Sequence, residues 1–312
     1  MTNNKAVVIV ELDSPVHFHK EILGLQLPIT INGHKYTINF PEDIPKEQYT
    51  GPLRPPRNFK HFKLRPDRCF GFKWDSKNNK ITIDTIILET EESNIKITYD
   101  HINEYLGLFN AYSLLVTGEH IINAKVEQDK IHSYFIKAGD TYKRKSMTTC
   151  ANITTVEQDH YKKLRRSDIE EICHILSNRD NWKMEMELEY LISSLKSYAE
   201  WDYRRAVLDA ATSCDIILRK RAEAELLKYP KIRRNAIMSS RHGIGDLNDL
   251  LKLLGIDVGS YNIEKINKPR NDAIHSGKDV TSKEAQDAIT EARRIILRYS
   301  ENEIVKYINK KS

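Results

Sequence analysis

The sequence predicts an α+β protein, in which a β-rich domain over residues 1–155 precedes an all-helical domain over residues 156–312. Alternation of apolar and polar residues dominates the first half, together with most of the glycines and prolines, whereas apolar residues three and four apart dominate the second half. At 312 residues, the chain is also long enough for about two domains of ordinary size.

Strand-like patterns recur through the first half. The predicted strands cover residues 6–12, the two arms of a hairpin over 28–40, and 81–88, 95–99, 120–126 and 131–137. Asn32 and Gly33 form the predicted hairpin turn, because this pair favours a turn whose twist matches that of the strands. One helix is predicted within the series, over residues 101–116.

Helical patterns fill the second half. Four apolar stripes or long runs predict helices, which lie around residues 169–176, 188–195, 203–227 and 244–254. A further long helix should begin at a capping box made by Thr281 and Glu284 and continue to Tyr299 with an apolar face.

Composition limits the class of protein. Lys and Arg number 49 against 44 Asp and Glu, a formal net charge of +5 that permits a polyanionic partner without requiring one. No apolar run approaches the ~20 residues of a membrane span, so we expect no membrane partner. The four cysteines lie far apart without a Cys-x-x-Cys pair, which argues against a zinc ribbon or a disulfide scaffold. We therefore expect a reduced, cytoplasmic protein without a metal or cofactor.

The most informative stretch for function is residues 267–277. Pro269 suits the first position of a short helix, which the Ser-Gly pair after His275 would end. Asn271 and His275 are four residues apart and share a helix face, with Arg270 beside them. A guanidinium can hold a phosphate through two hydrogen bonds, and an imidazole can transfer a proton near neutral pH. The stretch could therefore act on a phosphodiester.

A structural role for the same residues stays open. An Arg followed closely by a His is expected about once or twice by chance in a chain of this composition. His275 would then be a cation at the C-terminal end of a helix, stabilised by the helix dipole.

Taken with the long helix before it and the amphipathic helix after it, this stretch resembles the HEPN superfamily, in particular its abortive-infection and Apea-like branch of bacterial defence proteins. The resemblance covers roughly residues 185–310, and its most specific part is Arg270-Asn271 followed by His275. The family motif is an Arg, a polar residue, a few residues and then a His. The family's long helix often carries an acid, for which Asp215 is the best counterpart and Asp209 the second.

The resemblance implies a metal-independent endoribonuclease that acts in antiviral defence or abortive infection, as a toxin would, on RNA such as tRNA or mRNA. His275 would be the general acid and base, Arg270 would bind the phosphate, Asn271 would orient His275 or the substrate, and Asp215 would be a supporting acid. Two copies of the motif would meet in a homodimer through the C-terminal domain, and cleavage would leave a 2′,3′-cyclic phosphate. The N-terminal domain would sense a phage-derived or other trigger.

A second candidate is residues 54–74, where basic residues alternate with aromatic ones and Asp67 is the only acid. Basic side chains engage phosphates and aromatic rings stack on unpaired bases, so this stretch is a candidate RNA-binding segment. Its proposed RNA-binding residues are Arg54, Arg57, Lys60, Lys63, Arg65 and Arg68. The alternative is a pair of strands with aromatic residues in the core and cations in solvent.

Three functions therefore remain open from the sequence. The first is the endoribonuclease. The second is a non-catalytic HEPN-type module for dimerisation or ligand binding, which would tolerate the loss of Arg270 and His275. The third is an RNA-binding protein that works mainly through residues 54–74.

Overall fold

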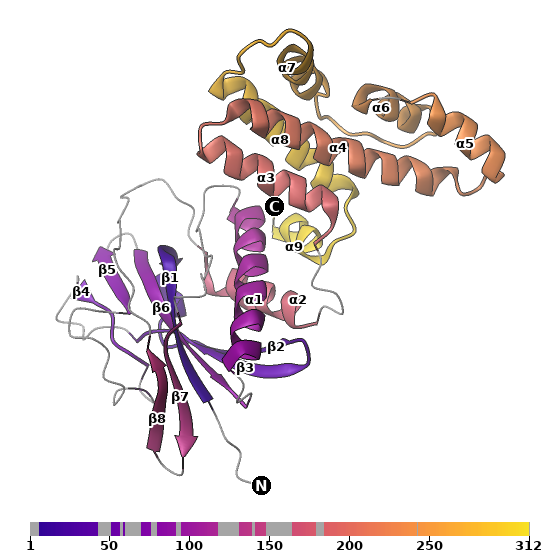
Figure 1. Ribbon diagram of the computed structural model, residues 1–312. Coiled ribbons are helices and arrows are strands. Elements are labelled where there is room, and N and C mark those ends of the chain that lie inside the picture. The colour runs from indigo at the N-terminus through magenta and orange to yellow at the C-terminus, as the bar shows by residue number, and fades with distance from the viewer. Residues whose placement is uncertain are drawn as a thin grey trace. The chain divides into compact units, whose positions relative to one another are not determined.

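Figure 1 traces the chain in a computed structural model. The structure describes residues 6–42, 51–56, 59, 70–75, 80–91, 95–117, 131–138, 141–147, 164–178, 184–241 and 243–311. The chain forms two compact units, Met1–Trp182 and Lys183–Ser312. The division lies later than residues 155 and 156, because helix α2 (Arg166–Ser177) packs on helix α1 (Ile95–Thr117) and strand β2 (Gln26–Ile31) of the first unit.

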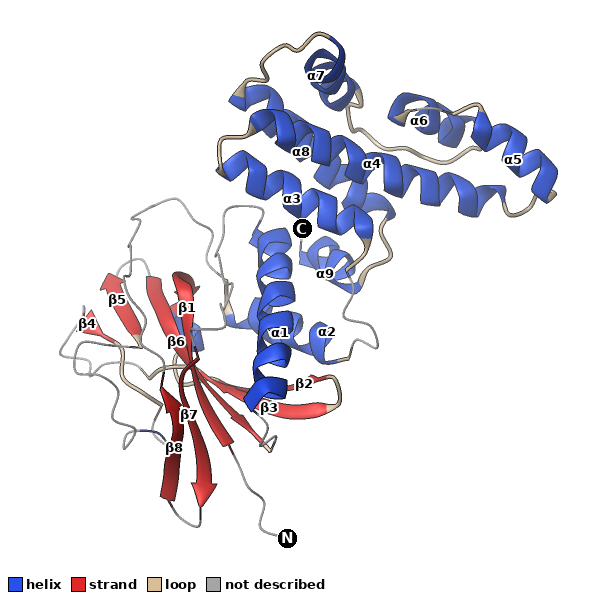
Figure 2. Cartoon of the chain, in the orientation of Figure 1, coloured by secondary structure: helices blue, strands red, loops and turns tan. Residues whose placement is uncertain are grey.

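Eight strands of the described residues form one sheet in the first unit. They are β1 (Ala6–His19), β2, β3 (His34–Asn39), β4 (Gly51–Pro52), β5 (Gly71–Asp75), β6 (Lys80–Thr90), β7 (Ile131–Ala138) and β8 (Thr141–Met147). The order is β2-β3-β6-β1-β7-β8, with β5 also pairing with β6 and β4 with β5, and the paired strands are antiparallel. Figure 2 shows these strands with the helices of the chain. The predicted α+β class is confirmed.

The predicted hairpin is confirmed, and Asn32 and Gly33 form its turn with φ of 49° and 79°. Both values lie in the left-handed region that this turn requires. The predicted first strand is part of β1, which continues to His19 past a register shift between Glu11 and Val16. The strand predicted over residues 120–126 lies outside the described residues.

The strand predicted over residues 95–99 is wrong, because these residues form the first turn of α1. β-branched residues there favour a strand by local preference. However, Thr98 and Ile102 are buried four residues apart, in line with Tyr105 and Phe109 further along the helix. The buried stripe of α1 therefore extends to its start, and packing overrides local preference.

Helices are the only regular secondary structure among the described residues of the second unit. Its helices are α3 (Met186–Ala199), α4 (Tyr203–Leu226), α5 (Lys231–Ser239), α6 (Ile244–Leu253), α7 (Glu264–His275), α8 (Ser282–Tyr299) and α9 (Glu303–Lys311). α4 packs against α3, α6, α7 and α8, so it is the central helix of this unit (Figure 1).

The long helices match the sequence patterns, and the capping box at the start of α8 is confirmed. The backbone nitrogen of Glu284 donates to the hydroxyl of Thr281 at 3.2 Å, and the backbone nitrogen of Thr281 donates to the carboxylate of Glu284 at 2.9 Å. The sequence patterns do not predict α5 and α9. α5 buries none of its residues, so it has no apolar stripe to reveal it.

Cys173 in α2 and Cys214 in α4 are buried free thiols, one in each unit. Burial raises the pKa of Cys173 to about 12 and also raises the pKa of Cys214. Among the described helices, none has the length and apolar character needed to cross a membrane.

Candidate active site

Helix α7 carries Arg270, Asn271 and His275, but it begins earlier than the sequence suggests. Pro269 lies inside the helix, so its prediction as the first helical residue is wrong. The start is set upstream, where the side-chain oxygen of Asn262 accepts a hydrogen bond from the backbone nitrogen of Glu264 at 3.0 Å. The predicted end is correct, because Gly277 follows with a left-handed φ of 60°.

The three motif residues lie in the second half of α7, with Arg270 half-buried and Asn271 and His275 exposed. At 3.6 residues per turn, Arg270 and His275 point about 140° apart around the helix axis. Nη1 of Arg270, however, donates to Oδ1 of Asn271 at 3.1 Å. This bond draws the guanidinium toward the face that Asn271 shares with His275. Among the described residues, no hydrogen bond joins Asn271 to His275, so the contact of Asn271 is with Arg270.

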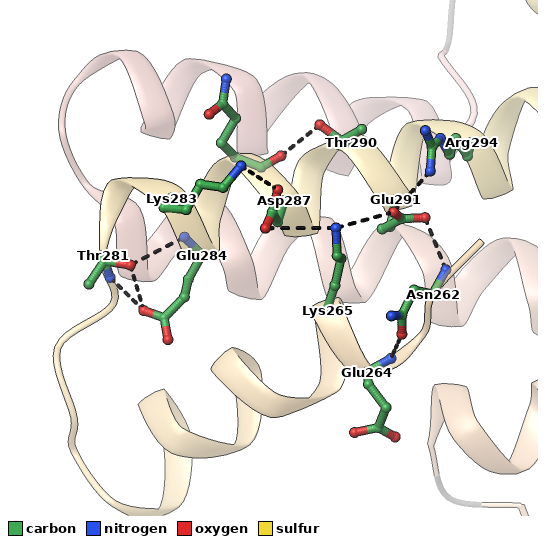
Figure 3. A network of polar contacts seen from close by, with 11 residues as sticks. Asn262, Glu264, Lys265, Thr281, Lys283, Glu284, Asp287, Thr290, Glu291 and Arg294 are labelled. Atoms are coloured by element: carbon green, nitrogen blue, oxygen red, sulfur yellow. Dashed lines mark hydrogen bonds and ion pairs between the residues drawn. The ribbon is translucent and has the colours of Figure 1, made fainter.

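A polar network fixes the start of α7 to α8, as Figure 3 shows. The carboxylate of Glu291, which is only 3% exposed, accepts a hydrogen bond from the backbone nitrogen of Asn262 at 3.0 Å. It also pairs with Arg294 at 3.0 Å and lies 4.0 Å from the ammonium of Lys265. The same ammonium lies 3.8 Å from Asp287, whose pKa is lowered chiefly by its hydrogen bond with Lys283.

The end of α7 is fixed to α4 by Arg204, a residue that the sequence analysis missed. Its Nη2 donates to the backbone oxygen of Ala273 at 2.9 Å, one of the last carbonyls of the helix, which lack partners within it. Ala273 itself is fully buried. α7 is thus held at both ends, and Arg204 adds a second guanidinium near the motif. Position in the sequence gives no sign of this, because the contact joins residues far apart in the chain.

The predicted supporting acid has a different partner. Asp215 pairs with Arg219 at 3.5 Å on the same helix, and it lies about 16 Å along α4 from Arg204. Asp209 is buried and accepts hydrogen bonds from Ser193 at 2.6 Å and from Arg205 at 2.9 Å. In the described part of the chain, no hydrogen bond or ion pair joins either carboxylate to Arg270 or His275.

Of the predicted RNA-binding residues in 54–74, only Arg54 is described. It is exposed, and its backbone pairs with that of Glu42. Arg57, Lys60, Lys63, Arg65 and Arg68 lie outside the described residues. Phe59 and Phe70 are each 1% exposed, so these two rings belong to the core and are not available to stack on bases. Phe59 and Phe70 therefore fit the alternative prediction for this stretch, in which the aromatic residues lie in the core.

The site thus presents a guanidinium and an imidazole on the exposed end of one fixed helix. These groups can bind a phosphate and transfer a proton. The described residues contain no group of three or more His, Cys, Asp or Glu side chains placed to hold a metal ion.

Comparison of the chain with protein-family models, with curated proteins and with solved structures found no match.

Proposed function

We propose that the protein is an endoribonuclease whose site is the second half of α7. The observation that carries the proposal is the placement of Arg270, Asn271 and His275 on the exposed end of a helix anchored at both ends. A reacting group gains most when rigid elements hold it in position. The motif's resemblance to the HEPN superfamily supports the choice of RNA, a role in antiviral defence and a cytoplasmic location.

In the proposed reaction, the ribose 2′-hydroxyl attacks the adjacent phosphorus while a base removes its proton. The bond from phosphorus to the 5′-oxygen breaks, and an acid protonates the departing oxygen. The products are a 2′,3′-cyclic phosphate and a 5′-hydroxyl. Arg270 binds the phosphate and the charge that develops on it, and His275 transfers a proton without a metal. Asn271 positions the guanidinium through the hydrogen bond to Arg270.

One imidazole cannot be base and acid in the same step, so the proposal includes a homodimer through the second unit. A two-fold axis near α7 would bring a second His275 to the site. Two large exposed apolar side chains, one on α7 and one just before the helix that carries Arg204, suit such an interface. Ile274 is 44% exposed beside His275, and Trp201 is 79% exposed just before α4.

The same exposed side chains favour a second candidate, a non-catalytic dimerisation module. In that case Ile274 and Trp201 would still form the interface, and His275 would only be a cation at the end of α7.

Cleavage of RNA by the full chain in excess chelator separates these candidates. His275→Ala should lower the rate by about 10²–10⁴-fold and leave the melting temperature and dimer unchanged. His174→Ala is the matched control, because His174 is also an exposed histidine in the last turn of a helix. Equal activity of the two variants would reject the assignment of His275. A requirement for magnesium, or a 5′-phosphate product, would reject the proposed chemistry.

A further inference from the structure

A cluster of basic side chains lies on α5 and the residues beside it. We call residues 228–241 the basic segment. It contains five cations, which are Lys228, Lys231, Arg233, Arg234 and Arg241. No Asp or Glu occurs from residue 226 to residue 245, so the positive charge is not balanced locally.

These cations also lack acidic partners elsewhere in the described residues, where none of the five forms an ion pair. The adjoining part of α4 differs. Arg219 pairs with Asp215 at 3.5 Å, Lys220 pairs with Glu187 at 2.6 Å, and Arg221 pairs with Glu225. The cations of α4 named here are paired with acids, whereas those of the basic segment, which follows the end of α4, are not.

The first turn of α5 concentrates this charge. Lys231, Arg233 and Arg234 lie there, and the turn has no acidic residue. The N-terminal end of a helix already carries partial positive charge, so cations at this end are unfavourable without an anion nearby. Because none of its residues is buried, α5 gains little from packing to offset this repulsion. A negatively charged ligand would remove the repulsion.

An aromatic ring organises two of the cations. The guanidinium of Arg233 lies 5.1 Å from the centre of the Tyr229 ring, and the ammonium of Lys228 lies 5.6 Å from it. Cation–π contacts of this kind hold long side chains in place without neutralising their charge. Arg233 and Arg234 can each then offer two parallel N–H groups to a phosphate.

We propose that the basic segment binds the phosphate backbone of RNA. The charge of the segment carries this inference, and the proposed function supplies the choice of RNA among polyanions. A membrane surface fits less well, because only Leu227 and Ile232 are large exposed apolar residues here, at 68% and 86%. Two such side chains do not make the apolar face that an interfacial helix inserts.

The basic segment is remote from the motif of α7. Arg204, which contacts the end of α7, lies near the start of α4, and α5 follows the other end of α4 (Figure 1). Arg204 and the end of α4, where the basic segment begins, are about 30 Å apart along the helix axis. RNA held by α5 must span this distance to reach the motif, so a dinucleotide cannot use both.

The test measures binding by the full chain of a labelled, 2′-O-methylated RNA that cannot undergo the proposed reaction. The variant combines Lys231→Gln, Arg233→Gln and Arg234→Gln. The control combines Lys306→Gln, Lys310→Gln and Lys311→Gln on α9, which removes the same charge elsewhere. Loss of three phosphate contacts should lower the slope of log affinity against log salt by about 2, and affinity by about 10–100-fold in moderate salt. The control should bind as the unmodified protein does.

Equal affinity and slope in variant and control would overturn the proposal, as would binding to anionic vesicles or an acidic peptide but not to RNA. If the triple variant unfolds, a double variant with Lys228→Gln and Lys231→Gln replaces it in the same binding measurement. Both lysines are exposed, so these changes should leave the fold intact. In the unmodified protein, RNA should protect Lys228 and Lys231 from acetylation but leave Lys310 reactive. Since these measurements involve no cleavage, the failure of the basic segment and the failure of the nuclease assignment are separate outcomes.

Discussion

Replacing Glu291 tests whether its carboxylate holds α7 in place. Glu291→Ala removes the acceptor for the backbone nitrogen of Asn262, a hydrogen bond to a charged group that contributes about 1.5 kcal/mol or more. Lys265 and Arg294 are 45% and 59% exposed, so screening limits their pairing with Glu291 to about 1 kcal/mol together. One lost buried methylene adds about 0.8 kcal/mol. The expected loss of stability is therefore about 3 kcal/mol.

Glu291→Gln is the matched variant, because its side chain keeps the volume and a carbonyl oxygen that can accept from Asn262. It should cost only about 1 kcal/mol. Urea unfolding followed by circular dichroism gives the free energies, and amide exchange over residues 264–275 shows whether α7 is the part that loosens. Equal losses for the two variants would show that charge pairing, and not the hydrogen bond, anchors α7. A loss below about 0.5 kcal/mol for Glu291→Ala would refute the anchoring role itself.

Further changes probe the two ends of α7 and the start of α8. Gly277→Ala should cost about 1 kcal/mol in thermal unfolding, because φ is 60° although no atom obstructs a Cβ. Arg204→Met keeps the apolar stem and should cost about 1 kcal/mol while speeding amide exchange over residues 272–277; unchanged exchange would remove its role. Thr281→Ala should cost about 1 kcal/mol at neutral pH. The backbone nitrogen and then the hydroxyl of Thr281 lower the pKa of Glu284 from its ordinary 4.5. The variant loses only the hydroxyl's bond to the carboxylate, whose contribution is present above about pH 4.5 and is lost as pH falls through the lower folded value. The bond that the hydroxyl accepts from the backbone nitrogen of Glu284 does not depend on pH. The difference between the urea midpoints of protein and variant should therefore shrink in acid without vanishing.

Local signals in the sequence identify those elements whose causes are local. Asn32-Gly33 sets its turn by its own backbone preference, and Thr281 with Glu284 sets a helix start through contacts three residues apart. Long helices with a buried stripe are also predictable, as α8 shows.

The errors arise where distant contacts decide the outcome. Residues 95–99 have the composition of a strand and become helix because they pack as part of α1. Pro269 looks like a helix start, but the bonds of Asn262 begin α7 earlier. The candidate site follows the same rule. Arg270, Asn271 and His275 can be found from their spacing, whereas Arg204 comes from a different helix and can be found only in the fold.

The two buried thiols supply a built-in measure of how each unit opens. A thiol reacts with an alkylating reagent as its thiolate, and burial keeps Cys173 and Cys214 both protonated and inaccessible. Each can be labelled only when the structure around it transiently unfolds. Because Cys173 lies in the first unit and Cys214 in the second, the labelling rate of each thiol in one sample reports the opening of its own unit. Equal rates at every urea concentration would mean that the units unfold as one, and different rates would rank their stabilities directly.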